Sequence, residues 1–169
     1  MNGDVEKVLL ALNRAGVRYL VVGGVAVVLH GHLRATHDLD LVIQLERTNV
    51  TRALAELEML GLQPNVPVAL RDFVEPEKRE QWAEDKNMMA FPLWNPRNPT
   101  QKLDLFIREP IDFDAAYGRA SRLKLGSIEV PVLSLPDLIA MKRNAGRPQD
   151  LADVHALEGI YTRSEEEAP

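Results

Sequence analysis

Two aspartates that alternate with leucines, Asp38 and Asp40, are the first residues of this chain that indicate chemistry. Residues 37–43 are predicted to form a strand with its apolar side chains on one face. Both carboxylates then project from the other face, about 6.6 Å apart along the chain. Because unpaired carboxylates repel each other, the pair favours a divalent cation with oxygen ligands, such as Mg²⁺. A solvated strand face is the alternative interpretation.

Asp104 adds a third carboxylate on a second alternating segment, residues 102–107, where it again falls on the polar side. If the two strands are neighbours, three carboxylates converge. Such a set suits a site for two metal ions roughly 3.5–4 Å apart. A single aspartate paired with Lys102 is the alternative, and the sequence leaves it open.

A glycine pair, Gly23-Gly24, separates a predicted buried strand over 19–22 from a short predicted helix over 25–31. Glycine lets the backbone approach a ligand closely, and a helix N-terminus offers free N–H groups to an anion. A tight turn with positive φ is the alternative. Arg34, just ahead of the aspartate pair, has a guanidinium that could fork onto a phosphate or form a surface salt bridge.

Near the other end of the chain, Lys142 lies on a predicted helix over 134–145. It is either a phosphate contact or a solvated lysine. Arg147 and Asp150 flank Pro148 where the next helix begins, and Asp150 would by itself favour that helix N-terminus. Three further polar residues, His30, His32 and His37, lack the spacing of a helical metal pair and are interpreted as ordinary loop histidines.

Composition narrows the classes of protein. The chain has 169 residues, 20 Lys and Arg, 25 Asp and Glu, a formal net charge of -5 and no cysteine. Disulfides, zinc ribbons, iron–sulfur clusters and thiol catalysis are excluded, and a broad nucleic-acid surface is disfavoured. No signal peptide or apolar run of membrane length is visible, so we expect a cytoplasmic protein without a membrane partner.

The elements that must position these residues indicate an α/β protein of the α+β type. A small mixed sheet is expected, with helices mainly on one face, in a single domain over 1–161 followed by a disordered acidic tail over 162–169. Helices are predicted over 5–15, 25–31, 48–60, 112–121, 134–145 and 148–158, with a charged, helical stretch at 71–86. Strands are predicted over 19–22, 37–43, 66–70, 87–94 and 102–107, with a hairpin over 123–133 and a loop over 95–101.

These motifs together resemble the nucleotidyltransferase superfamily that includes DNA polymerase β. The match consists of Val22-Gly23-Gly24, a spacer over 25–37, Asp38-Leu39-Asp40-Leu41, and Asp104 on a later strand. Arg34, Thr36 and Asp38, in the pattern R-x-T-x-D, look like the version found in AbiEii-type toxins. Lys142 and the stretch 146–153 are similar to the closing motif of that group.

The resemblance implies a nucleotidyltransferase fold and an Mg²⁺-dependent transfer of a nucleoside monophosphate from an NTP, such as ATP, to a hydroxyl, with release of pyrophosphate. It implies that Asp38 and Asp40 hold two Mg²⁺ ions. It implies that Asp104 holds the catalytic ion and takes the proton of the acceptor hydroxyl. The nucleotide would be bound by Gly23, Gly24, Arg34, Thr36, Lys142, Arg147 and Asp150.

The acceptor stays open between tRNA, a protein and a small molecule. AbiEii-type toxins, which pair with an antitoxin-like protein, are usually longer, whereas small antibiotic-modifying nucleotidyltransferases of the lincosamide kind have a similar size. A non-catalytic nucleotide- or protein-binding module on the same fold is a second hypothesis. A metal-dependent hydrolase is a third, although it would need an open water position and usually histidine ligands.

Overall fold

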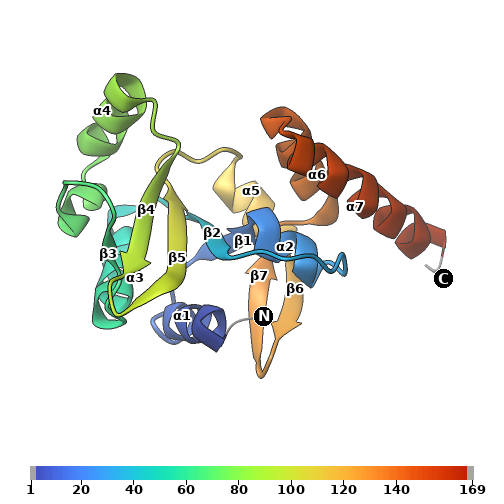
Figure 1. Ribbon diagram of the computed structural model, residues 1–169, viewed down its shortest axis with the longest axis horizontal. Coiled ribbons are helices and arrows are strands. Elements are labelled where there is room, and N and C mark those ends of the chain that lie inside the picture. Colours follow the sequence, from blue (N-terminus) through green and yellow to red (C-terminus); the bar gives the residue numbers. More distant parts are fainter. Residues whose placement is uncertain (1–2, 167–169) are drawn as a thin grey trace.

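The computed structural model describes residues 3–166 (Figure 1). Its helices are α1 (Gly3–Arg14), α2 (Gly23–Leu29), α3 (Arg47–Met59), the 3-10 helix η1 (Leu70–Val74), α4 (Pro76–Lys86), α5 (Phe113–Gly118), α6 (Leu135–Ala145) and α7 (Pro148–Glu166). Its strands are β1 (Tyr19–Val22), β2 (Asp38–Ile43), β3 (Gln63–Pro64), β4 (Ala90–Asn95), β5 (Asn98–Phe106), β6 (Ser121–Leu125) and β7 (Ile128–Val132).

The strands form one seven-stranded sheet in the order β3-β4-β5-β2-β1-β7-β6. β2 runs parallel to β5 and β1 runs parallel to β7, while the other neighbours are antiparallel. The predicted mixed sheet and α/β class are therefore confirmed. Figure 1 shows α4 on one side of the molecule and the α6–α7 pair on the other, with the sheet between them.

The two faces of the sheet differ because side chains alternate along each strand. Leu39, Leu41, Leu103 and Leu105 are buried on one face. Helix α4 covers part of that face, where Trp82 stacks on Phe91 with ring centroids 5.1 Å apart. The opposite face carries the aspartates of β2 and β5, and α2 begins there.

Several predicted boundaries are confirmed because local chemistry sets them. Ser134 caps α6 by accepting a hydrogen bond from the Asp137 backbone N–H, and its hydroxyl donates to the Asp137 carboxylate. Gly146 ends that helix with φ +66°, a conformation that glycine adopts without steric cost. The hairpin of β6 and β7 turns at Gly126, where φ is +57°.

The predicted loop over 95–101 is wrong, because β4 and β5 continue through it as a hairpin that turns at Pro96 and Arg97. Pro99 suggested a loop since proline cannot donate to a strand ladder. The ladder between β2 and β5 begins only at Asp38 and Lys102, so Pro99 lies beyond it. A proline is tolerated where no ladder bond is required.

The predicted strand over 66–70 is also wrong. β3 is shorter and earlier, and the Val68 backbone N–H donates to the Val66 carbonyl at 2.8 Å. This i to i+2 bond makes a tight turn around Pro67. Proline therefore bends the apolar run, and the chain enters η1 instead of continuing as a strand.

Helix α7 continues past its expected end near residue 158 and reaches Glu166. Residues 162–166, expected in the acidic tail, are therefore helical, and 167–169 lie outside the described residues. The expected single domain over 1–161 stays a prediction. None of the helices formed by residues 3–166 combines the length and apolar character needed to cross a bilayer.

Candidate active site

Asp40 of β2 and Asp104 of β5 are register partners on neighbouring parallel strands. Paired residues of adjacent strands point to the same side of a sheet, so both carboxylates project from one face. Asp38 lies two residues earlier on β2, on the same face and opposite Lys102. The condition set by the sequence, that the two aspartate-bearing strands be neighbours, is met.

The electrostatics of this group favour the uptake of positive charge. The pKa of Asp40 is raised to about 6, chiefly by burial and in addition by the nearby carboxylates of Asp104 and Asp38. Burial and the charge of Asp38 also raise the pKa of Asp104, against the opposing charge of Lys102. Because desolvation and like charge both disfavour the ionised forms, a cation placed among them would be stabilised.

The glycine pair lies in direct contact with this carboxylate group. A Cβ atom on Gly23 would lie 2.0 Å from Asp40 Oδ2, and the φ of +63° at Gly23 already favours glycine. A Cβ on Gly24 would lie 2.3 Å from Thr36 Oγ1 and 3.0 Å from Arg34 Nη2. The Gly24 backbone N–H donates to the Asp40 carboxylate and thereby lowers its pKa somewhat. Both glycines are thus required by the side chains that pack on them.

Arg34 joins this turn to the C-terminal helices through a buried carboxylate. Its guanidinium forks onto Asp153, with Nε 2.8 Å from Oδ1 and Nη2 2.9 Å from Oδ2. Lys142 Nζ lies 2.8 Å from Asp153 Oδ2 and 3.1 Å from Asp150 Oδ1. Arg147 Nε completes the chain of ion pairs at 2.9 Å from Asp150 Oδ2.

This network has a buried centre and an exposed end. Asp153 is 0% exposed and Lys142 is 7% exposed, whereas the Arg147 side chain is 80% exposed. Burial by itself would raise the pKa of Asp153, but the hydrogen bonds from Arg34, Lys142 and Gln149 together lower it. The positive charge of Lys142 also acts on Asp40, whose pKa it lowers. The network therefore borders the carboxylate group.

Most of the predicted site residues are brought into one region. Asp38, Asp40 and Asp104 share a sheet face, Gly23, Gly24, Thr36 and Arg34 lie in contact beside it, and Lys142, Asp150 and Arg147 follow through ion pairs. Asp153 was missed. It closes the quoted stretch 146–153 and lies one helical turn after Asp150, a spacing that puts both carboxylates on the same side of α7.

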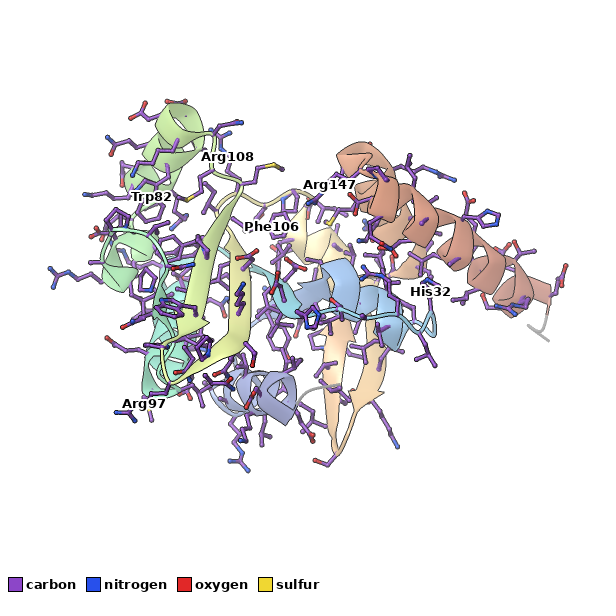
Figure 2. The ribbon with its side chains drawn as sticks, viewed as in Figure 1. His32, Trp82, Arg97, Phe106, Arg108 and Arg147 are labelled. Carbon is purple, nitrogen blue, oxygen red and sulfur yellow. The ribbon has the colours of Figure 1, made fainter. Side chains whose placement is uncertain are left out.

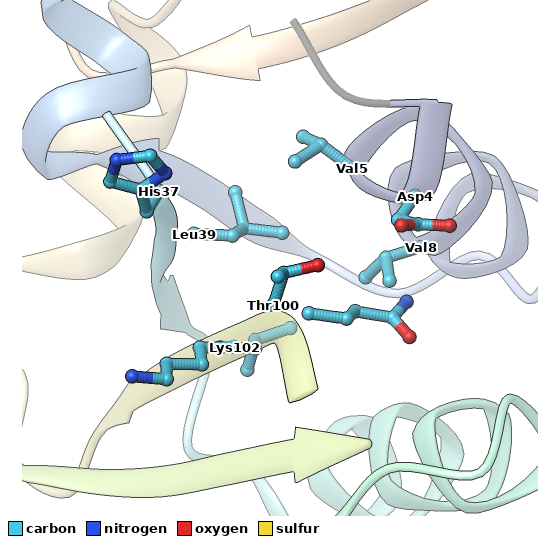
Figure 3. Close-up of a pocket in the computed structure, with 9 residues that line it drawn as sticks. Asp4, Val5, Val8, His37, Leu39, Thr100 and Lys102 are labelled. Carbon is cyan, nitrogen blue, oxygen red and sulfur yellow. The ribbon is translucent and has the colours of Figure 1, made fainter. Parts of the chain in front are cut away.

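The histidines do not form a metal site. His30 Nε2 is 2.8 Å from the Leu133 carbonyl oxygen, a contact that fixes the end of α2, and burial lowers its pKa. His37 lines a cavity of about 10 Å³ on the leucine side of β2, together with Val5 and Val8 of α1 (Figure 3). This cavity holds about one water molecule and is too small for a substrate.

The donor set fits Mg²⁺ in its chemistry. Asp38, Asp40 and Asp104 offer hard oxygen ligands, and burial without a bound counter-ion leaves two of them with raised pKa values. Across residues 3–166, no three His, Cys, Asp or Glu side chains are already close enough to share one ion. Joint coordination of one ion by these aspartates would therefore require their carboxylates to move closer together.

Solved structures with the same fold are nucleotidyltransferases. The lincomycin-bound lincosamide antibiotic adenylyltransferase LnuA has a TM-score of 0.64 and 16% identity, covering 95% of this chain and 98% of its own. ANT(2")-Ia in complex with adenylyl-2"-tobramycin has a TM-score of 0.63 and 17% identity, covering 96% and 89%. At this identity the likeness establishes the nucleotidyltransferase fold.

The family itself follows from the sequence. Residues 4–164 match the family described as "Nucleotidyltransferase of unknown function (DUF6036)", and the chain belongs to that family. No curated protein matches the chain. The expected superfamily is thus confirmed, while the likeness to AbiEii-type toxins stays a prediction.

Proposed function

We propose that this protein is an Mg²⁺-dependent nucleotidyltransferase that moves a nucleoside monophosphate from an NTP to a hydroxyl group and releases pyrophosphate. One observation carries the proposal. Asp40 and Asp104 are register partners on a shared face, with raised pKa values, beside a glycine turn and a cationic network. Phosphoryl transfer depends on positioning and on neutralised charge, and this arrangement can provide both.

Each group has a distinct part in the proposed reaction. Asp38, Asp40 and Asp104 would hold two Mg²⁺ ions, which when bound neutralise the triphosphate and polarise the reacting phosphorus. Asp104, at the outer side of the group, would accept the proton of the attacking hydroxyl.

The nucleotide would lie on the other side of Asp40. Phosphate oxygens would lie against the backbone of the turn at Gly23 and Gly24, with Thr36 beside it. Lys142 has two of its three N–H donors directed at Asp150 and Asp153, so one donor is left for a phosphate. Arg147 is exposed at the edge of the network, where it could reach the phosphate tail.

Binding and turnover together test the proposal. Each of the four common NTPs, labelled at the α-phosphate, is incubated with Mg²⁺, and both NTP binding and pyrophosphate release are measured. We expect binding of at least one NTP, and loss of turnover in Asp40→Asn and Asp104→Asn. Tight binding without pyrophosphate release would instead favour a binding module, and no binding of any NTP would refute the proposal.

The acceptor we favour is a small molecule. Of the two fold neighbours, LnuA is lincomycin-bound and ANT(2")-Ia is in complex with adenylyl-2"-tobramycin, and this chain is similar to both over most of its length. A toxin role with an antitoxin-like partner stays a prediction that the neighbouring reading frame tests. The expected cytoplasmic location also stays a prediction.

A further inference from the structure

The two faces of the β4–β5 hairpin have different compositions. Residues that alternate along it are buried on the leucine side of the sheet. The residues between them lie on the carboxylate face, where cross-strand pairs join Ala90 to Phe106, Pro92 to Asp104 and Trp94 to Lys102. Lys102 is exposed and the other five are half-buried. We refer to these six residues as the hairpin strip.

The hairpin strip lies directly beside the proposed reaction centre. Asp104 belongs to it, and Asp40 is the register partner of Asp104 on the next strand. Pro92 borders Asp104 on the side away from β2. A molecule resting on Phe106 and Pro92 would therefore be next to the carboxylate that is proposed to accept a proton.

The opposite flank of the carboxylate group is already suited to phosphate. The glycine turn follows β1, on the far side of β2 from the hairpin strip, and the network of Arg34 and Lys142 lies beyond it. Figure 2 labels Phe106 on the side of β5 toward α6. It labels Arg147 at the start of α7, the end of that helix nearer to the sheet. Phosphate and acceptor would then approach from opposite flanks.

From this arrangement we infer that the hairpin strip binds the acceptor, and that the acceptor is a small hydroxylated molecule with an apolar ring face. The inference rests on the proposed function. Phe106 and Pro92 would contact the ring face, and one hydroxyl would reach Asp104. In the transfer, the hydroxyl gives its proton to Asp104, an O–P bond forms at the α-phosphorus, and the bond to pyrophosphate breaks.

The charges around the hairpin strip argue against a nucleic-acid acceptor. A polyanion is held by several lysines and arginines, and within these six residues Lys102 is the sole cation. Arg108, which follows β5, is paired with Glu80 of α4. Aromatic and proline surfaces instead suit an uncharged or cationic ring compound.

Because the chain contains no cysteine, one introduced thiol is a unique chemical handle. The experiment uses Ala90→Cys, which places a thiol beside Phe106, and captures disulfide-bearing fragments under mildly reducing conditions with intact-mass detection. The fragments form three classes: ring alcohols, phosphate-bearing fragments and short peptides. Met59→Cys on α3, where residue 59 is 81% exposed, controls for thiol reactivity. Lys102→Cys is a second handle on the strip.

We expect ring alcohols to be captured roughly fivefold better at residue 90 than at residue 59, as one aromatic contact predicts. Adding Phe106→Ala to Ala90→Cys should abolish this preference. Preferred capture of phosphate-bearing or peptide fragments would overturn the inference. Capture of ring alcohols at residues 90 and 102 that is no better than at residue 59 would also overturn it. So would a preference for residue 90 that survives Phe106→Ala.

A second arm repeats the capture with saturating NTP and Mg²⁺, after NTP binding to the same variant has been measured. Capture that persists supports separate nucleotide and acceptor positions. Capture that is lost would assign the hairpin strip to the nucleotide base and overturn the inference. If no NTP binds while ring alcohols are still captured, the proposed function fails and the binding surface stands.

Discussion

Asp40 and Asp104 lie side by side on parallel strands, 64 positions apart in sequence, and within residues 3–166 neither carboxylate forms an ion pair with a lysine or an arginine. Two half-buried carboxylates on one face oppose each other's ionisation. The free energy of folding therefore depends on pH and on cations through this pair.

The first prediction concerns pH. In the presence of EDTA, the site's contribution to stability should fall as pH rises from about 4 to about 6, because folded Asp40 holds its proton more tightly than the unfolded chain does. The shift from 3.8 to about 6 corresponds to about 3 kcal/mol at most. Urea unfolding at pH 4 to 8 measures it. Asp40→Asn should flatten this part of the curve, because an amide does not titrate, while its side-chain oxygen can still accept a hydrogen bond from the Gly24 N–H. Asp85→Asn on α4 should leave the curve unchanged.

The second prediction concerns metal. Mg²⁺ should raise the melting temperature at pH 7.5, because it binds the folded carboxylate group and not the unfolded chain. At a hundred times its Kd the gain is about 2.7 kcal/mol. Asp40→Asn and Asp104→Asn should each lose most of this gain. An equal Mg²⁺ effect in all three proteins would place the ion elsewhere.

The third prediction concerns the glycine turn. Gly24→Ala should destabilise the fold by about 1–3 kcal/mol and weaken NTP binding, because its methyl group meets Thr36 and Arg34. Gly159→Ala is the matched control. It lies in α7 with nothing within 4 Å of a Cβ, and should be neutral or stabilising by up to about 1 kcal/mol. Thermal unfolding and NTP titration of both variants provide the comparison.

The fourth prediction concerns Asp153. Its replacement by alanine leaves the Arg34 and Lys142 charges without their shared carboxylate, which should cost about 3–5 kcal/mol. Glu158→Ala, on the same helix, breaks an exposed pair with Arg143 and should cost about 0–1 kcal/mol. Chemical denaturation measures both. Similar losses in the two variants would contradict a structural role for the buried network.

Most residues of the candidate site could be predicted from the sequence, but neither their spatial arrangement nor the full set of residues could. The alternation around Asp40 and Asp104 defines their faces, because strand periodicity is local. Their adjacency is tertiary, and no local pattern sets which strands pair. Asp153 was missed for the same reason: its partners, Arg34 and Lys142, are brought to it by the packing of α6 and α7.

Two of the errors in the fold come from proline. Pro67 bends an apolar run that would otherwise be a strand, and Pro99 is accepted in β5 because the neighbouring strand has not yet begun. In the first case a local turn overrides strand propensity. In the second, the place of the residue in the sheet decides, and the sequence does not contain that information in a local pattern.

The pair of Arg34 and Asp153 spans 119 residues. Contacts of such sequence separation form late in folding, and a chain emerging from the ribosome folds from its N-terminus. Until α7 has left the exit tunnel, the guanidinium beside the glycine turn lacks its anchor. A nascent or proteolytically shortened chain would therefore lack this pair, and under the proposed function we expect it to be inactive until synthesis has passed this helix.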